Sequence, residues 1–321
     1  MKDRQKKRGG IKYYLAVLAV VLAAIIGGAD SGTIAYILRE AGSIIQSADT
    51  GVSDDGNEVE RTEEGEIQPL IVTFIDVGQG DSILLQCGGH NMLIDAGKND
   101  QGTKLQAYFN SKKIESFDYL VGTHPDEDHI GGLDVIITKF QASHVLMPDR
   151  KADTKTYDDV ILAMKYKSIS PENPKPGDSF SLGDARITVL GPPEKKYGNN
   201  NNYSIVLMVR HGNKKFLFTG DAEEEEEMDI LESGADVDAD VLKAGHHGSK
   251  SSSCQEFLNA VSPEAAVISC GEDNKYGHPH AETMNNLRIM GVDVYRTDRE
   301  GAIVIESDGD NLTFNVPPSE W

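Results

Sequence analysis

Four side chains that can bind metal ions occur within six residues, in the order His124, Asp126, Asp128 and His129. A short apolar run before them predicts a buried strand, and apolar residues at helical spacing over 130–140 predict a helix. A turn between a strand and a helix would bring all four side chains into one small volume. A charged helix cap is the alternative, but a cap uses one acidic residue and gains nothing from two histidines. The pattern therefore favours a binuclear metal site, with the first two residues on one ion and the last two on the other.

This stretch resembles the second signature of the metallo-β-lactamase superfamily, His-x-His-x-Asp-His, with Asp126 in place of the second histidine. The variant, followed by two glycines, is similar to the extracytoplasmic hydrolase domain of ComEC-like DNA-uptake proteins and their stand-alone relatives. The resemblance extends over about residues 70–310. It implies an α/β fold, the αββα sandwich of that superfamily. The alternation of strand-like runs with single helices along the chain agrees with an α/β architecture.

Three further motifs fit the same family in the expected order. The segment 74–82 matches the family's opening hairpin, and we expect its Asp76 and Asp81 to organise the turn rather than to bind metal. Asp95 matches the first signature, which implies a carboxylate that orients metal ligands by hydrogen bonding. Asp221 matches the fourth signature, which implies a carboxylate that bridges two metal ions.

The third signature departs from the superfamily pattern, because no histidine occurs in the segment 198–204. Asn202 and Ser204 match the ComEC-like version, and we expect them to contact the metal ligands or the substrate. With Asp126 also replacing a histidine, only His124 remains as a nitrogen ligand of the first ion. Oxygen-rich sites favour harder ions such as manganese, whereas imidazole-rich sites favour zinc. The expected cofactors are therefore two divalent ions, Zn²⁺ or Mn²⁺.

The histidines of the C-terminal half complete the predicted site. His246 and His247 resemble the fifth signature; we expect His246 to bind the second metal and His247 to contact ligands or substrate, although the reverse assignment stays open. His278 follows a predicted strand and could bind substrate phosphate or donate a proton to the leaving group. Asp128 and His278 are the predicted catalytic residues.

These residues predict a metal-dependent hydrolase in which a hydroxide between the two metal ions attacks phosphorus. No Ser-His-Asp or Cys-His arrangement that would indicate covalent catalysis is readable. The ComEC-like resemblance alone implies a phosphodiester substrate, DNA or another nucleic acid, and hence a phosphodiesterase or nuclease. Two alternatives stay open: hydrolysis of a small ester, lactone or cell-wall phosphodiester such as phosphorylcholine, and a non-catalytic metal-binding module.

The composition limits how the protein could bind nucleic acid. The chain of 321 residues carries a formal net charge of -21, whereas proteins that grip phosphates by electrostatics are normally basic. Tight non-specific DNA binding is therefore disfavoured, but cleavage through metal-bound phosphate is not. The run of acidic residues at 223–227 is expected to form an exposed helix face. Three cysteines provide no disulfide framework.

The N-terminal part predicts export. Residues 1–29 combine a basic flank with an uncharged apolar run, which is typical of a signal peptide or of a single membrane anchor. Residues 30–68 form an acidic segment that we expect to be a flexible linker, and residues 69–321 form the hydrolase domain. The predicted location is the outer side of the cell membrane, or secreted. No protein partner is readable.

Overall fold

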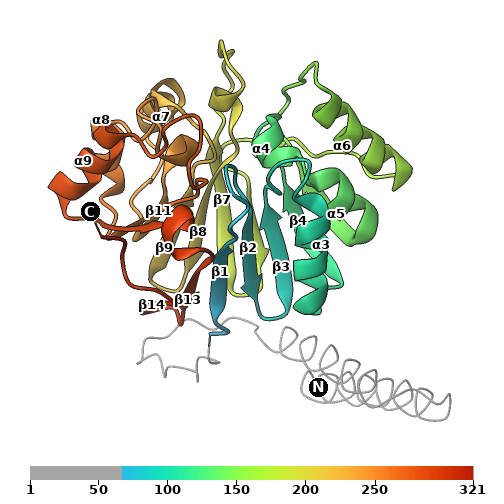
Figure 1. Ribbon diagram of the computed structural model, residues 1–321, viewed down its shortest axis with the longest axis horizontal. Helices are drawn as coiled ribbons and strands as arrows, with labels where there is room; N and C mark the ends of the chain where they lie inside the picture. Colours follow the sequence, from blue (N-terminus) through green and yellow to red (C-terminus); the bar gives the residue numbers. More distant parts are fainter. Residues whose placement is uncertain (1–66, 321) are drawn as a thin grey trace, which may run out of the picture. The chain divides into compact units, whose positions relative to one another are not determined.

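The computed structural model describes residues 67–320, and within them two seven-stranded sheets lie face to face with helices on both outer sides (Figure 1). The order of the first sheet is β14-β13-β1-β2-β3-β4-β5, and that of the second is β12-β11-β10-β9-β8-β7-β6. The α/β two-sheet fold expected from the sequence is therefore confirmed. The expected membrane segment and nearly all of the expected linker lie outside the described residues. Within residues 67–320, no helix has the length and apolar character needed to cross a membrane.

The strands and helices have the following bounds. The first sheet contains β1 (Leu70–Phe74), β2 (Ile83–Cys87), β3 (His90–Ile94), β4 (Ser116–Val121), β5 (Gln141–Leu146), β13 (Ile303–Ser307) and β14 (Leu312–Phe314). The second contains β6 (Ser179–Leu182), β7 (Ala185–Gly191), β8 (Val206–His211), β9 (Lys214–Phe218), β10 (Val241–Lys243), β11 (Ala265–Ile268) and β12 (Asp293–Arg296). The α-helices are α3 (Gly102–Ser111), α4 (Glu127–Ile130), α5 (Leu133–Lys139), α6 (Lys155–Tyr166), α7 (Glu224–Glu232), α8 (Gln255–Val261), α9 (Ala281–Met290) and α10 (Thr297–Glu300).

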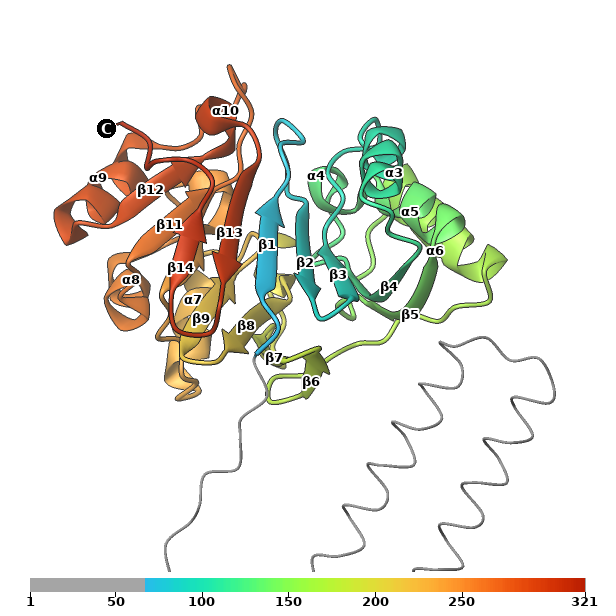
Figure 2. The same cartoon turned by 90° about the horizontal axis from the view of Figure 1, so that it is seen from below.

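The main core lies between the two sheets. Leu70, Val72 and Phe74 alternate along β1 and are fully buried, because successive side chains of a strand point to opposite faces. Phe74 meets Phe218 of the second sheet, with ring centroids 6.1 Å apart. Two further apolar clusters lie under the outer helices, one beneath α3, α5 and α6 and the other beneath α7, α8 and α9 (Figure 2).

Parallel pairing places the motifs at one edge of the sandwich. β3 pairs with β4 in parallel, and β9 pairs with β10 in parallel. The carboxyl ends of parallel neighbours lie at the same edge, so the residues that follow these four strands are brought together. The segments carrying Asp95, His124, Asp221 and His247 follow β3, β4, β9 and β10 in that order.

The helix expected over 130–140 is divided into α4 and α5 by two glycines. A Cβ atom on Gly131 would lie 2.3 Å from the backbone nitrogen of Asn99, so only glycine permits this close approach. The backbone N–H of Ala96 donates to the carbonyl of His129 at 2.7 Å in the same contact. At this break, the loop after β3 packs directly against the turn that carries the metal motif.

Two glutamates of α7 are buried, contrary to the expectation of an exposed helix face. Glu226 and Glu227 are both 0% exposed. The carboxylate of Glu227 accepts hydrogen bonds from the backbone N–H groups of Ser253, at 2.6 Å, and Cys254, at 2.9 Å. Cys254 is the N-cap residue of α8, so Glu227 ties α7 to the start of α8. Burial raises the pKa of Glu227 from its usual value near 4.5 to about 7.

Because of this raised pKa, we expect the effect of Glu227→Gln on the free energy of unfolding to depend on pH. Between pH 4.5 and 7 the folded state binds more protons at this group than the unfolded state, so its contribution to the free energy of unfolding falls as the pH rises through that window. The stability of the variant relative to wild type should therefore rise by about 3 kcal/mol between pH 5 and pH 8. Urea denaturation across that range measures the difference. Glu232→Gln, an exposed position of the same helix, should give a constant difference; a constant difference for Glu227→Gln would contradict the prediction.

Candidate metal centre

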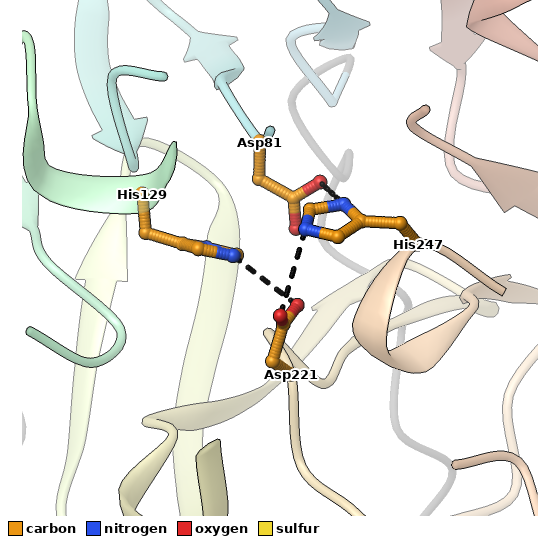
Figure 3. Close-up of side chains that lie close together, drawn as sticks. All are labelled: Asp81, His129, Asp221 and His247. Atoms are coloured by element: carbon orange, nitrogen blue, oxygen red, sulfur yellow. Dashed lines mark ion pairs between the residues drawn. The ribbon is translucent and has the colours of Figure 1, made fainter. Parts of the chain in front are cut away.

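Four buried side chains from both sheets converge at this edge: Asp81, His129, Asp221 and His247 (Figure 3). Each offers one possible ligand atom, and these atoms lie within 4.8 Å of one another. Nε2 of His129 is 3.2 Å from Oδ1 of Asp221, and Nε2 of His247 is 3.5 Å from Oδ2 of the same carboxylate. Asp221 thus lies between two imidazoles, with one oxygen facing each. Asp128 borders the cluster, with Oδ2 3.6 Å from Nε2 of His247.

A hydrogen-bond network behind the cluster fixes the orientation of His129. Its Nδ1 lies 2.8 Å from Oδ2 of Asp95, which is itself fully buried. Asp95 also accepts from the backbone N–H of Thr123 at 2.8 Å and from its hydroxyl at 2.7 Å. With Nδ1 directed to this carboxylate, Nε2 of His129 faces Asp221. This is the orienting arrangement that the sequence implied for Asp95.

The two adjacent histidines have different surroundings, and His247 rather than His246 lies in the buried cluster. Both have positive φ angles, 48° and 56°, so the backbone turns sharply between β10 and Ser249. Nδ1 of His247 lies 2.9 Å from the carbonyl oxygen of Ser269, and because a carbonyl only accepts, this nitrogen carries the proton and Nε2 is free to bind metal. His246 is partly exposed; its Nδ1 is 3.3 Å from Glu223 and its Nε2 is 3.6 Å from Asp221. The geometry thus favours the reverse of the expected assignment, with His247 in the buried cluster, although both histidines approach Asp221.

Asp81, expected only to organise a turn, is instead part of this cluster. Its Oδ2 lies 2.9 Å from Nζ of Lys243, and its Oδ1 lies 3.4 Å from Nδ1 of His247. Lys243 is 0% exposed and also donates to the carbonyl of Ala244 at 2.8 Å. Gly80 makes this position reachable, because a Cβ atom there would lie 2.4 Å from the carbonyl oxygen of Asp128. Asp76 does organise the turn, accepting from the backbone N–H of Gly78 at 3.0 Å.

The unpaired atoms of the cluster fit divalent metal ions. Nε2 of His124, His129 and His247, together with Oδ1 of Asp81 and Asp221, are buried and have no hydrogen-bond partner within residues 67–320. Buried polar atoms are normally paired, so these unpaired atoms, four of them on residues that converge within 4.8 Å, are suited to binding a ligand. Imidazole nitrogens combined with carboxylate oxygens are a suitable donor set for zinc or manganese. Burial opposes charge on His129, but Asp221 and Asp95 hold its pKa well above its usual value, so a proton stabilises the cluster as a cation would.

The first predicted metal position is more open. Nε2 of His124 lies 3.9 Å from Oδ2 of Asp126, which is partly exposed. Ser204 contacts both halves of the site, since its hydroxyl is 3.4 Å from Nδ1 of His124 and accepts from the backbone N–H of Asp221 at 3.0 Å. Asn202 does not reach the cluster; its side-chain oxygen accepts from the backbone N–H of Glu223 at 2.9 Å. Asn202 therefore holds the start of α7 instead of contacting a metal ligand.

His278 lies beside the rings of His246 and His247. Its ring centroid is 5.4 Å from that of His246 and 6.1 Å from that of His247. Burial and the neighbouring histidines lower its pKa to about 4, so the ring is neutral at neutral pH. The side-chain oxygen of Gln79 accepts from the backbone N–H of Gly271 at 3.2 Å, which directs its amide nitrogen to Nδ1 of His278 at 3.5 Å. This orientation favours the tautomer with the proton on Nε2, which suits a hydrogen-bond donor to substrate better than a proton donor to the leaving group.

Sequence reasoning missed several residues that support the site. Lys243 lies in a strand and Gln79 in a turn, and both contact the site. The sequence pattern of each segment indicates only a structural role. Asn200 belongs to an asparagine-rich segment whose composition indicates a loop. Its side-chain amide nevertheless donates a hydrogen bond to Asp126 at 2.8 Å. Glu223 seemed only to begin a helix, but it accepts from the hydroxyl of Ser251 at 2.9 Å and lies against His246. These four residues could have been suspected from the sequence only because each lies in or near a segment that matches a family motif.

The model of the metallo-beta-lactamase superfamily matches residues 75–272, and the chain belongs to this superfamily. Among curated proteins, it is 32% identical over 265 residues to ComE operon protein 3 of Bacillus subtilis, covering 77% of this chain and 34% of that protein. It is 33% identical over 234 residues to competence protein ComA of Neisseria gonorrhoeae, covering 72% of this chain and 31% of that protein. The chain thus spans about a third of the length of these relatives, and its ComEC-like character is confirmed.

Among solved structures, the metallo-beta-lactamase fold protein YhfI from Bacillus subtilis superposes with a TM-score of 0.50 at 16% identity, over 75% of this chain and all of that chain. At this identity the likeness shows the fold alone. Fold, family and cluster together define a metal-dependent hydrolase fold with a candidate metal site.

Proposed function

We propose that this protein is a metal-dependent phosphodiesterase that cleaves nucleic acid. The observation that carries the proposal is the set of buried, unpaired nitrogen and oxygen atoms shared by His129, Asp221 and His247. Such a donor set suits a divalent cation, and phosphodiester hydrolysis is a reaction that paired cations support. The similarity to a competence protein supports nucleic acid as the substrate class. Because the chain spans about a third of its relatives, the substrate remains our proposal.

We assign each residue of the site a role in this reaction. His129, His247, Asp128 and Asp221 would hold one ion, and His124, Asp126 and Asp221 a second. Bound there, the ions would supply Lewis-acid activation of water and of the phosphate. Asp95 fixes the ring of His129, and the carbonyl of Ser269 fixes that of His247, so both present Nε2 to the site. The neutral ring of His278 is placed to donate a hydrogen bond from Nε2 to a phosphate oxygen, which stabilises developing negative charge.

The metal preference follows from the donors at the first position. Asp126 adds a hard oxygen donor where the superfamily has an imidazole, and Ser204 lies where another histidine would be expected. Manganese should therefore restore more activity to the metal-stripped protein than zinc does. Asp126→His should shift this ranking towards zinc.

The assay uses single-stranded DNA and bis(p-nitrophenyl) phosphate, with a carboxylic ester and a lactone as comparison substrates. The proposed function requires hydrolysis of the phosphodiesters at a rate above that of the comparison substrates. Preferential hydrolysis of the ester or lactone would refute it. An unchanged metal ranking in Asp126→His would show that Asp126 does not set the preference, while leaving the phosphodiesterase assignment intact.

The location is part of the same proposal. We infer that the catalytic domain acts outside the cytoplasmic membrane, as an anchored or secreted protein, because a basic flank precedes an apolar run in residues 1–29. Protease added to intact cells with an accessible outer surface should digest the domain. Complete protection of the domain in those cells would contradict export.

A further inference from the structure

Arg150 carries a guanidinium group that is held in place on two sides. Its Nε donates to the side-chain oxygen of Asn200 at 2.9 Å. Its central carbon lies 4.8 Å from the centroid of the Tyr203 ring, in a cation–π contact. These two contacts fix the plane of the group. Among the ion pairs within residues 67–320, none involves Arg150, so its two terminal nitrogens face no carboxylate there.

Asn200 lies between the guanidinium group of Arg150 and the metal centre, and it prevents a direct ion pair between that group and Asp126. The amide nitrogen of Asn200 donates to Oδ1 of Asp126 at 2.8 Å, while its oxygen accepts from Arg150. One amide group therefore stands between the guanidinium and a predicted metal ligand. It separates the two charges that would otherwise form an ion pair, so the arginine lies beside the metal centre with its charge available.

Two neighbouring lysines, by contrast, are neutralised by carboxylates. A cavity of about 360 Å³ is lined by Tyr203 and by three lysines, of which Lys175 and Lys195 pair with carboxylates. Nζ of Lys175 is 3.4 Å from Glu194, and Nζ of Lys195 is 2.8 Å from Asp229. In a chain of net charge -21, a fixed and unpaired guanidinium beside the metal site is a feature that packing alone does not require. The planar guanidinium group presents parallel N–H donors whose spacing matches that of two oxygens of a phosphate.

We infer that Arg150 binds a second phosphate of the substrate, next along the strand from the phosphate that is cleaved. This inference rests on the proposed phosphodiesterase function and narrows its substrate class. The preferred substrate is then a polynucleotide, or another chain with repeated phosphates, rather than an isolated phosphodiester. The site recognises the backbone and not the base, because a guanidinium–phosphate contact carries no sequence information.

The test compares dinucleotides that differ by one terminal phosphate. Wild-type protein is assayed on TpT, on 5′-phosphorylated pTpT and on 3′-phosphorylated TpTp. For one of the two phosphorylated forms, kcat/KM should exceed that for TpT by about tenfold, the value of one good phosphate contact. In Arg150→Met this ratio should fall to near one, and in Arg150→Lys it should be intermediate. Lys196→Met removes an exposed cation that lines the neighbouring cavity and should keep the wild-type ratio.

A binding measurement separates this inference from the proposed function. Calorimetry with thymidine 3′,5′-bisphosphate and with each thymidine monophosphate requires no turnover. Tighter binding of the bisphosphate that is lost in Arg150→Met supports the subsite, even in a protein that hydrolyses none of the dinucleotides. A wild-type ratio near one, or a preference that Arg150→Met retains, overturns the inference while phosphodiesterase activity on DNA can still stand.

Discussion

Replacing Asp221 with asparagine should abolish tight binding of divalent metal and lower kcat/KM for phosphodiesters by at least about 100-fold. The carboxylate of Asp221 is buried between three imidazoles, with Oδ1 3.2 Å from His129 and Oδ2 within 3.6 Å of both His246 and His247. Asparagine keeps the shape but supplies a single neutral acceptor, and its amide nitrogen cannot bind a cation. Losing even a residue that only orients a metal ligand costs 10–100-fold in affinity or activity, so a residue at the centre of the cluster should cost more.

Calorimetry with manganese on the metal-stripped protein measures the binding effect directly. Asp238→Asn is the matched control, because that carboxylate is exposed and pairs with Lys215 at the surface. The variant should also change the protonation of the metal-free site. Asp221 is a main cause of the raised pKa of His129, so the pKa of that ring should fall in Asp221→Asn. Unchanged affinity and stoichiometry for manganese would show that Asp221 is not a ligand.

The sequence predicted those parts of the site that lie within one continuous motif. His129 and Asp221 lie in motifs that each directly follow a predicted strand, and parallel pairing then fixes the edge at which they meet. The orienting role of Asp95 was implied by the resemblance of its segment to the first signature of the superfamily. The α/β fold was predicted because strand-like runs and helices alternate along the chain. Leu70, Val72 and Phe74 of β1 all belong to the core between the sheets, as the pleat of a strand requires.

The rest depends on contacts between distant segments. His246 and His247 are adjacent and chemically identical, and both have positive φ angles. Contacts with distant segments, such as that of His247 Nδ1 with the carbonyl of Ser269, accompany the entry of the His247 ring into the cluster. Asp81 lies in the turn between β1 and β2 of the first sheet, whereas Lys243 ends β10 of the second, so their pairing depends on how the two sheets pack. Glu226 and Glu227 occur in an acidic run whose composition indicates an exposed face, but the packing of α7 against the second sheet buries two of its members.

Lys243→Met should destabilise the domain by about 3–5 kcal/mol, the cost of removing one partner of a buried ion pair. Both members of this pair are buried, with Nζ of Lys243 2.9 Å from Oδ2 of Asp81. Burial opposes the charge of Asp81, but Lys243 and His247 hold its pKa well below its usual range. Without the lysine, the buried carboxylate of Asp81 keeps only histidines as cationic neighbours within the described residues, so it must either take up a proton or remain charged with weaker compensation.

The double variant Asp81→Asn/Lys243→Met distinguishes a buried ion pair from a simple loss of packing. With both charges gone, no uncompensated charge remains, so the double variant should be more stable than either single variant. Urea denaturation of the metal-stripped protein measures the coupling between the two positions. Lys155→Met, which removes an exposed lysine paired with Asp159, should leave the unfolding midpoint unchanged. Additive effects in the double variant would mean that Lys243 contributes through packing alone. Coupling would instead support Asp81 as a carboxylate that is neutralised by Lys243 while its other oxygen faces the ring of His247.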